Sequence, residues 1–189
     1  MRSFISTVAT LLPLAAAAPL QARDSNPGCQ AASFGDFEWT VENFDFHASY
    51  IFTTPAHQNS WGYVTFNLTN PALEYQAACS ASSDQLSDFF YGTMPYTCQV
   101  PDGSTTKATF DFSRPSGVLD VNQTWTCSDE DAQYPTTINA YGTANLTLAC
   151  TDETWTNPNW TLGQIYTSRT VACEPVTIPL KPYHMTAVA

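Results

Sequence analysis

The residue pattern that most constrains the fold is an alternation of apolar and polar side chains, which recurs in short runs. In residues 36–44, DFEWTVENF, Phe37, Trp39 and Val41 share one face, and residues 63–70, YVTFNLTN, alternate in the same way. Side chains of a β-strand point alternately to its two faces, so this period of two predicts strands with one buried face. Beyond the N-terminal segment no helical period of useful length appears.

Further strands are predicted wherever the alternation returns between turn residues. These segments are residues 73–79, 94–100, 107–113, 117–127, 144–150 and 169–180. Proline, glycine and asparagine separate them at regular intervals, which favours an antiparallel sandwich or barrel. One helical turn is predicted in residues 80–90, SASSDQLSDFF, where a serine is placed to cap it.

The N-terminal segment has the layout of a leader. Arg2 precedes an apolar run and then a stretch of alanines, as in a secretory signal peptide. The apolar run is shorter than the ~20 residues that a membrane-spanning helix needs. We therefore expect residues 1–18 to be a signal peptide and the product to be secreted and extracellular. Residues 19–28 would then form a short N-terminal segment, residues 29–180 one domain and residues 181–189 a flexible tail.

All six cysteines follow the predicted leader: Cys29, Cys79, Cys98, Cys127, Cys150 and Cys173. An even number of cysteines in an exported chain predicts three disulfides. Zinc is a poor alternative, because the cysteines lack metal-ligand spacing and the three histidines are scattered. The fold-class prediction is an all-β, single, compact antiparallel β-barrel or sandwich braced by disulfides.

The pairing of the cysteines stays open at this level, since six of them combine in many ways. Two pairs are neighbours at hairpin range: Cys79 with Cys98, and Cys127 with Cys150. Those two bonds would leave the first and the last cysteine to join the ends of the domain.

The charge balance excludes several classes of partner. The formal net charge is −11, from 17 acidic and 6 basic residues. Such a surface repels phosphate backbones and anionic headgroups, so we expect neither nucleic acid nor a membrane as partner. Aromatic residues make up 13% of the chain, which favours a folded domain over an acidic disordered segment.

Four Asn-x-Thr sequons predict a glycoprotein. They begin at Asn67, Asn122, Asn145 and Asn159. If they are glycosylated, these asparagines lie at the surface of the domain.

No catalytic constellation stands out, and we assign no catalytic residue, metal or cofactor. A Gly-x-Ser-x-Gly elbow is missing from the sequence. The best enzyme alternative is a small β-sandwich glycosidase with two carboxylates among Glu38, Glu42, Glu74 and Glu174. Glu38 and Glu42 alternate with large apolar residues, however, and should face solvent. The acidic run 129–131 lacks the glycine and distal glutamate of a calcium loop and is interpreted as solvated.

Two stretches offer a possible binding surface. A loop closed by Cys79 and Cys98 would present three side chains on a constrained segment: Asp84, Asp88 and Tyr91. Trp155 and Trp160 lie in a polar stretch, where exposed rings can stack on sugars or anchor a protein. The alternative is that these tryptophans fold back onto the end of a barrel.

Three motifs carry a resemblance to a known family. They are Gly35-Asp36-Phe37-Glu38-Trp39 after Cys29, the segment 73–98 with its Ser/Ala-Asp-x-Leu-x-Asp loop between two cysteines, and residues 110–125, FDFSRPSGVLDVNQTW. In these residues the chain resembles the Alternaria major allergen-like domain of secreted fungal allergens and plant-defence elicitors.

The resemblance implies a compact extracellular β-barrel without enzymatic activity. It also implies a Cys79–Cys98 disulfide and a second pair in the C-terminal half, matching Cys127 and Cys150. Some relatives have an unpaired early cysteine that links two chains, whereas Cys173 here offers Cys29 an internal partner. We therefore expect a monomer or a homodimer and leave a covalent dimer in doubt.

The function predicted from the sequence is that of a secreted, non-enzymatic allergen-like or elicitor-like effector. It would act by surface recognition of a host protein or cell-wall component. The alternatives are a carbohydrate-binding module and, third, the small glycosidase. Fold resemblance does not by itself decide between them.

Overall fold

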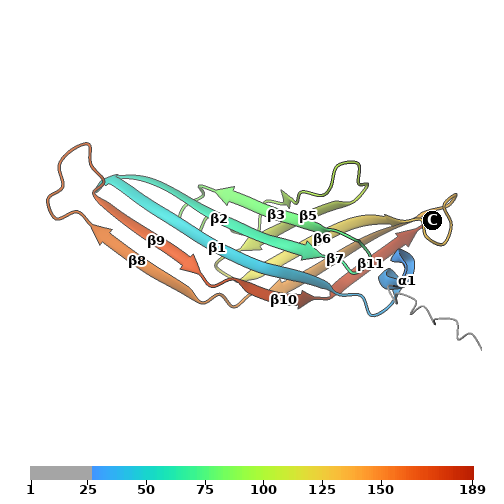
Figure 1. Cartoon of the computed structure of the whole chain (residues 1–189). Coiled ribbons are helices and arrows are strands. Elements are labelled where there is room, and N and C mark those ends of the chain that lie inside the picture. Colours follow the sequence, from blue (N-terminus) through green and yellow to red (C-terminus); the bar gives the residue numbers. More distant parts are fainter. Residues whose placement is uncertain (1–26) are drawn as a thin grey trace, which may run out of the picture.

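Antiparallel strands make up most of the chain in the computed structural model, which describes residues 27–189 (Figure 1). The first sheet has six strands, in the order β3–β2–β1–β9–β8 with β10 paired to β1. They are β1 (Trp39–Thr54), β2 (His57–Thr69), β3 (Gln76–Ser83), β8 (Cys150–Thr156), β9 (Thr167–Cys173) and β10 (Val176–Leu180).

The second sheet has five strands in the order β11–β7–β6–β5–β4. They are β4 (Tyr96–Thr97), β5 (Lys107–Ser113), β6 (Val118–Cys127), β7 (Thr136–Asn145) and β11 (Pro182–Val188). The all-β antiparallel prediction is confirmed. Of its two forms the structure has the sandwich, because the sheets do not close into a barrel.

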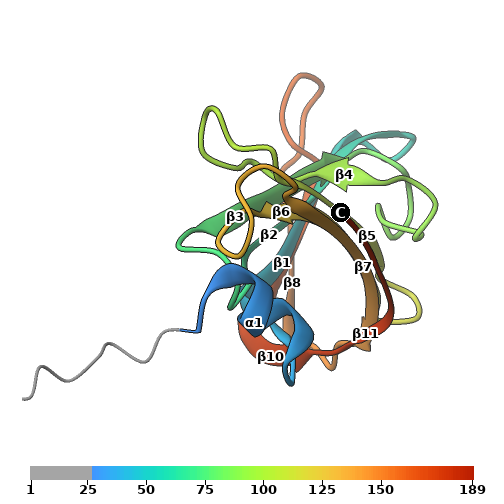
Figure 2. The same ribbon diagram turned by 90° about the vertical axis from the view of Figure 1, so that its right-hand side faces the viewer.

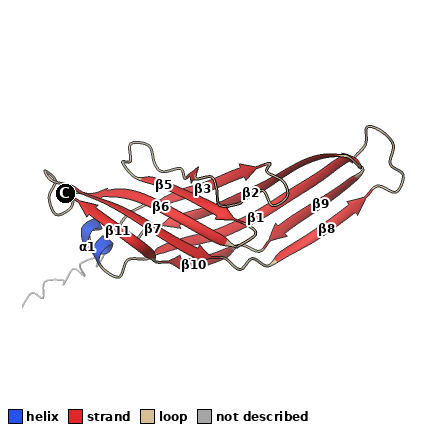
Figure 3. Cartoon of the chain, turned by 180° about the vertical axis from the view of Figure 1, so that it is seen from behind, coloured by secondary structure: helices blue, strands red, loops and turns tan. Residues whose placement is uncertain are grey.

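The two ends of the sandwich differ. The helix α1 (Cys29–Phe34) lies across one end, which faces the viewer in Figure 2. At the other end the six-stranded sheet extends past the five-stranded one, with β8 and β9 outermost (Figure 3). The β3–β4 loop at this end packs against the inner face of the longer sheet, where the Phe89 ring lies 5.0 Å from that of Tyr50.

The alternation in the sequence explains the core. Along β1, Trp39, Val41, Phe44 and Phe46 are fully buried, while the residues between them face outward. The bulge between Val41 and Phe44 shifts the register by one residue and keeps both in the core. Rings from both sheets continue this interior, as Phe44 and Phe112 meet edge to face at 5.0 Å.

A buried amide holds the α1 half of the core together. Gln123 is 1% exposed, and its Oε1 accepts hydrogen bonds from Trp39 Nε1 at 2.7 Å and Asn70 Nδ2 at 2.8 Å. A buried donor without a partner destabilises the fold, and this one oxygen provides the partner for both N–H donors.

All six cysteines form disulfides, and the pairing corrects part of the prediction. Cys79 bonds Cys98 as predicted, which joins the edges of the two sheets. Cys127 and Cys150 do not bond each other, although both lie at hairpin range in the sequence. Cys127 ends a strand of the second sheet and Cys150 begins a strand of the first, so they belong to different sheets.

The two remaining bonds follow from that arrangement. Cys150 lies directly opposite Cys173 in the β8–β9 pair and bonds it. Cys127 bonds Cys29 of α1, so the predicted Cys29–Cys173 bond is wrong. Every cysteine therefore has a partner within the chain.

Three further sequence predictions are corrected. The tail 181–189 was predicted to be flexible, but Pro182–Val188 forms β11 on the edge of the second sheet, with Met185 opposite Ala140. Residues 80–90 form no helix, since β3 runs to Ser83 and a turn follows. Of the strand predicted at 144–150, residues 146–149 form the connection between β7 and β8, and most of those two strands was not predicted.

The predicted signal peptide, residues 1–18, lies outside the described residues. Within the part that the structure describes, no helix is long and apolar enough to cross a membrane.

Candidate functional site

The segment between β3 and β4 forms a loop at the overhanging end, which we call the clamped loop (residues 84–95). The Cys79–Cys98 disulfide closes it at its base. Two phenylalanines anchor it in the interior, since Phe89 is 0% and Phe90 1% exposed. The loop is therefore fixed both by a covalent bond and by buried rings.

Phe89 holds the loop against the longer sheet. Its ring lies 5.0 Å from that of Tyr50 on β1. On the β2 side it approaches Gly62 so closely that a Cβ there would fall 2.6 Å from the Phe89 ring. Only glycine leaves room for this contact.

Polar contacts fix the turn of the same loop. Tyr50 Oη donates a hydrogen bond to the Ser87 carbonyl at 2.9 Å. Arg114 Nη1, which follows β5, donates to Tyr50 Oη at 3.1 Å and to Asp88 Oδ1 at 3.3 Å. The Arg114 guanidinium also lies 4.7 Å from the centre of the Phe46 ring. One arginine thus ties the loop to both sheets.

The structure places the three predicted loop residues differently. Asp88 and Tyr91 come together, because the Asp88 N–H donates to Tyr91 Oη at 3.1 Å. With the Arg114 contact, these two residues hold the loop in shape. Asp84 is exposed at the start of the loop, next to Trp61 of β2. The binding role of all three stays a prediction.

A second arginine lies on the other side of Tyr50. Arg169 of β9 stacks over the Tyr50 ring at 4.9 Å and forms an ion pair with Asp152 of β8. Hydrogen bonds from Arg169 lower the pKa of the Asp152 carboxyl, and the same bonds raise the pKa of Arg169. Both arginines at this end are thus engaged with carboxylates.

The structure does not bring the two predicted tryptophans into one surface. Trp155 lies on β8 and is 53% exposed. Trp160 folds back within the β8–β9 loop, where its Nε1 donates to the Gln164 carbonyl at 3.0 Å and its ring meets Tyr166 edge to face. Trp155 is available to a partner, whereas Trp160 mainly stabilises its own loop.

The outer face of the longer sheet carries exposed rings, which we call the outer aromatic patch (His47, Trp61 and Tyr63). Trp61 is 41% and Tyr63 37% exposed. His47 lies opposite Tyr63 in the β1–β2 pair and stacks on it, with ring centres 5.0 Å apart. His47 Nδ1 lies 3.1 Å from Asp45 Oδ2, which fixes the orientation of the imidazole.

The sequence analysis missed the outer aromatic patch, although the alternation contains the signal for it. Asn67 of β2 is a sequon residue and was therefore expected at the surface. Counting back by twos from Asn67 reaches Tyr63 and Trp61. Exposed rings in that register indicate a contact surface rather than core.

Two shallow depressions flank the outer aromatic patch. One, of about 410 Å³, is lined by Tyr63 and His47 with hydroxyl-bearing residues of β2 and β3. The other, of about 160 Å³, lies between Trp61 and the clamped loop and includes Asp84 and Leu86. The patch and the loop therefore form one continuous surface.

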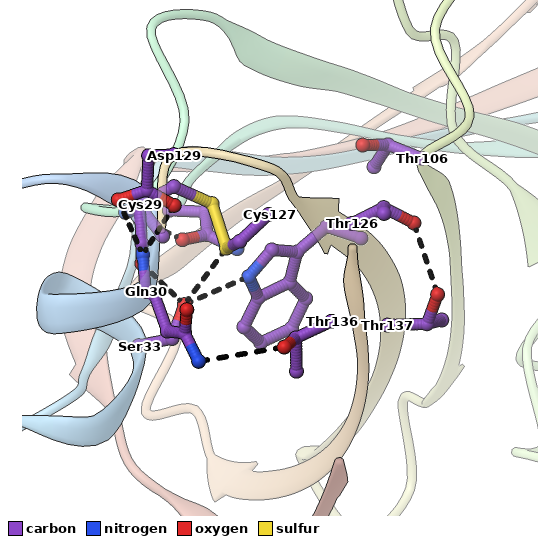
Figure 4. Close-up of a disulfide and its surroundings, with 12 residues drawn as sticks. Cys29, Gln30, Ser33, Thr106, Thr126, Cys127, Asp129, Thr136 and Thr137 are labelled. Atoms are coloured by element: carbon purple, nitrogen blue, oxygen red, sulfur yellow. Dashed lines mark hydrogen bonds between the residues drawn. A yellow bond between two sulfur atoms is a disulfide. The ribbon is translucent and has the colours of Figure 1, made fainter. Parts of the chain in front are cut away.

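The opposite end is organised around the Cys29–Cys127 disulfide (Figure 4). Trp125 is buried beneath α1, and its Nε1 donates to Ser33 Oγ at 2.9 Å. Ser33 in turn donates to the Cys29 carbonyl at 2.7 Å. The helix therefore closes this end as a structural plug.

The largest depression, about 560 Å³, lies beside that disulfide. Over residues 27–189, the one group of three potential metal ligands is found here: Cys29, Cys127 and Asp129. Both sulfurs are in the disulfide, so neither is a thiolate that could bind zinc. The Asp129 carboxylate accepts a hydrogen bond from the Gln30 N–H, as Figure 4 shows.

Carboxylates converge at a place that the sequence analysis did not name. Asp111 and Asp120 lie directly opposite each other in the β5–β6 pair, on the outer face of the second sheet. Burial, and to a lesser extent the Asp120 charge, raises the pKa of Asp111. Of the glutamates considered for a glycosidase, Glu42 accepts a hydrogen bond from Thr69 at 2.7 Å on the outer face of the other sheet.

The four sequons all lie on outward-facing positions. Asn145 and Asn159 are exposed, while Asn67 and Asn122 lie within strands and are half-buried. Glycosylation of these sites stays a prediction.

The family model named Alternaria alternata allergen 1 matches residues 41–173, which is most of the chain. The chain belongs to this family. The match begins in β1 and ends at Cys173, so it includes both anchors of the clamped loop and the outer aromatic patch. The resemblance predicted from the sequence motifs is confirmed. Comparison with curated proteins and with solved structures found no significant match.

Proposed function

We propose that this allergen-like fungal protein is a secreted, non-enzymatic effector that recognises a host protein or cell-wall component through the outer aromatic patch and the adjoining clamped loop. The observation that carries the proposal is the exposure of Trp61 and Tyr63 on β2, where the inner-facing residues from Ser60 to Leu68 are buried. Single exposed rings are normal on a soluble surface, whereas rings gathered in one patch are typical of a surface that contacts a partner.

Secretion is supported by the disulfides and by the layout of the leader. Three disulfides persist in an oxidising compartment and are rare in the cytosol. A rigid, acidic and cross-linked domain suits a protein that works outside the cell.

The non-enzymatic assignment is supported by the carboxylate pair. Asp111 and Asp120 are half-buried and lie side by side on one sheet face, where they line a depression of about 410 Å³ instead of facing each other across a cleft. Glycosidases need one buried acid across a cleft from the second carboxylate. A recognition role therefore fits the geometry better than hydrolysis.

The test is to apply the purified protein to leaf tissue and measure both surface-bound protein and the oxidative burst. Trp61→Ala should reduce binding and response together. The control Tyr134→Ala removes a more exposed ring from the β6–β7 loop and should change neither. A protein that neither binds host material nor elicits a response would refute the proposal, and so would hydrolysis of a substrate that depends on Asp111.

A further inference from the structure

We propose, resting on the function proposed above, that the outer aromatic patch binds a neutral cell-wall polysaccharide. The sugar chain would lie along β2 from the Tyr63 depression to the Trp61 depression, with Asp84 at its end. Four features of this face support the proposal: the rings, their polar surroundings, the charge of the face and the clamped loop packed behind it.

The rings are spaced for successive contacts. Trp61 and Tyr63 are two residues apart on one strand face, which places their Cα atoms about 7 Å apart. His47 covers one face of Tyr63 and leaves the opposite face available. The C–H face of a pyranose is apolar and slightly positive, and it therefore complements the negative face of an aromatic ring.

Hydroxyl and carboxylate groups flank the rings on both sides. Thr65, Ser80 and Ser82 line the Tyr63 depression. Asn59 and Asp84 line the one beside Trp61. Apolar surface with a few polar groups at its margin is the composition of a small-ligand site, and these groups can pair with sugar hydroxyls.

The charge of this face selects for a neutral ligand. The four basic residues within the described range lie elsewhere: Lys107, Arg114, Arg169 and Lys181. Arg169 points inward, over Tyr50. Asp45 and Asp84 are the nearest charged groups on the patch, so phosphates, sulfates and uronates meet repulsion there.

The surface is rigid before any ligand arrives. The strand segment that carries both rings is backed at Gly62 by the buried Phe89 ring. The Cys79–Cys98 disulfide and the Arg114–Asp88 ion pair hold Phe89 in place. A ligand therefore binds without the cost of ordering its site.

A second copy of the chain is a poorer occupant. A stable protein interface usually buries more than about 1,000 Å², with a continuous apolar centre. Here Ser49 and Ser82 lie beside the rings on the neighbouring strands, and two chains of net charge −11 repel each other.

The experiment measures retention of the full-length secreted protein by insoluble β-glucan and by chitin, with polygalacturonate as an anionic comparison. Trp61→Ala and Tyr63→Ala should each weaken binding about 2- to 13-fold, since a stacked ring contributes about 0.5–1.5 kcal/mol. The control Tyr134→Ala should bind like the wild type. Both patch rings are on the surface, so the melting temperatures of the variants should match that of the parent.

An added Asn67→Gln substitution prevents a glycan at the nearby sequon from masking the patch. Retention by either neutral polymer, lost with Trp61 or Tyr63, supports the inference, and the two arms show which polymer is preferred. Retention by polygalacturonate alone, or retention unaffected by both ring substitutions, overturns it. If the protein binds leaf tissue but neither neutral polymer, the inference falls and the proposed function stands. If it binds nothing, both fall.

Discussion

Gly62→Ala tests whether the clamped loop really supports the outer sheet face. A methyl group at this position falls 2.6–2.7 Å from three atoms of the Phe89 side chain, well inside van der Waals contact. The ring cannot easily retreat, because Phe89 is fully buried and its N–H donates to the Gln85 carbonyl at 2.7 Å. Either the strand or the loop must move.

The expected cost follows from two opposing effects. Overpacking of this kind destabilises a core by about 1–3 kcal/mol. Replacing glycine by alanine also restricts the unfolded chain, which returns about 0.4–1 kcal/mol. The net loss should be about 1–2 kcal/mol, which lowers the Tm of a domain of this size by about 2–8 °C.

The assay is urea unfolding followed by tryptophan fluorescence, combined with a double-mutant cycle. Phe89→Ala alone should cost about 3–5 kcal/mol through the cavity it creates. Gly62→Ala combined with Phe89→Ala should cost less than the sum, by about 1 kcal/mol or more, because the clash disappears with the ring. Additive effects, or a Gly62→Ala variant as stable as the parent, would refute the contact as we describe it.

Two further predictions concern the clamp and a carboxylate. Replacing Cys79 and Cys98 together by serine opens a loop with a sequence separation of 19 and should lower the free energy of unfolding by about 3 kcal/mol. Proteolysis near Leu86 should become faster. An unchanged Tm would show that the bond is not structural. Asp111→Asn should raise stability near pH 7 but not at pH 3, when the two proteins are compared by urea unfolding at both values. The folded-state pKa of Asp111 is raised above 3.8, so protonation of this carboxyl favours the folded state. Its contribution to the free energy of unfolding is complete below pH 3.8 and is lost as the pH rises through the folded-state pKa. A variant that is less stable than the parent at pH 7 would contradict this reading.

The alternation in the sequence was sufficient to predict the core faces of several strands. Phe37, Trp39 and Val41 are buried as expected, and β5 begins and ends at the predicted residues. A period of two is a local property, so one strand at a time can be read from it. The strand in the tail was not predicted because β11 is an exposed edge strand. Its order depends on pairing with β7, which is not a local property of the sequence.

The disulfide pairing depends on information that is not local. Cys127 and Cys150 are separated by β7, which returns along β6 within the second sheet. The chain then crosses to the first sheet before Cys150, where Cys173 lies directly opposite. Distance along the chain cannot reveal such a crossing, because only the order of strands in the sheets decides which cysteines meet.

The roles of the candidate site residues also depend on contacts between segments that are distant in the sequence. Asp88 and Tyr91 were expected to be displayed by the clamped loop, yet the Asp88 carboxylate binds Arg114 and Tyr91 Oη accepts a hydrogen bond from the Asp88 N–H within the loop. Their contacts, together with the ring of Phe89, instead support β2 from behind at Gly62. The rings on the far side of that strand are the ones left open to a partner. The clamped loop therefore supports the proposed recognition surface more than it forms that surface, and of its three predicted binding residues only Asp84 adjoins Trp61.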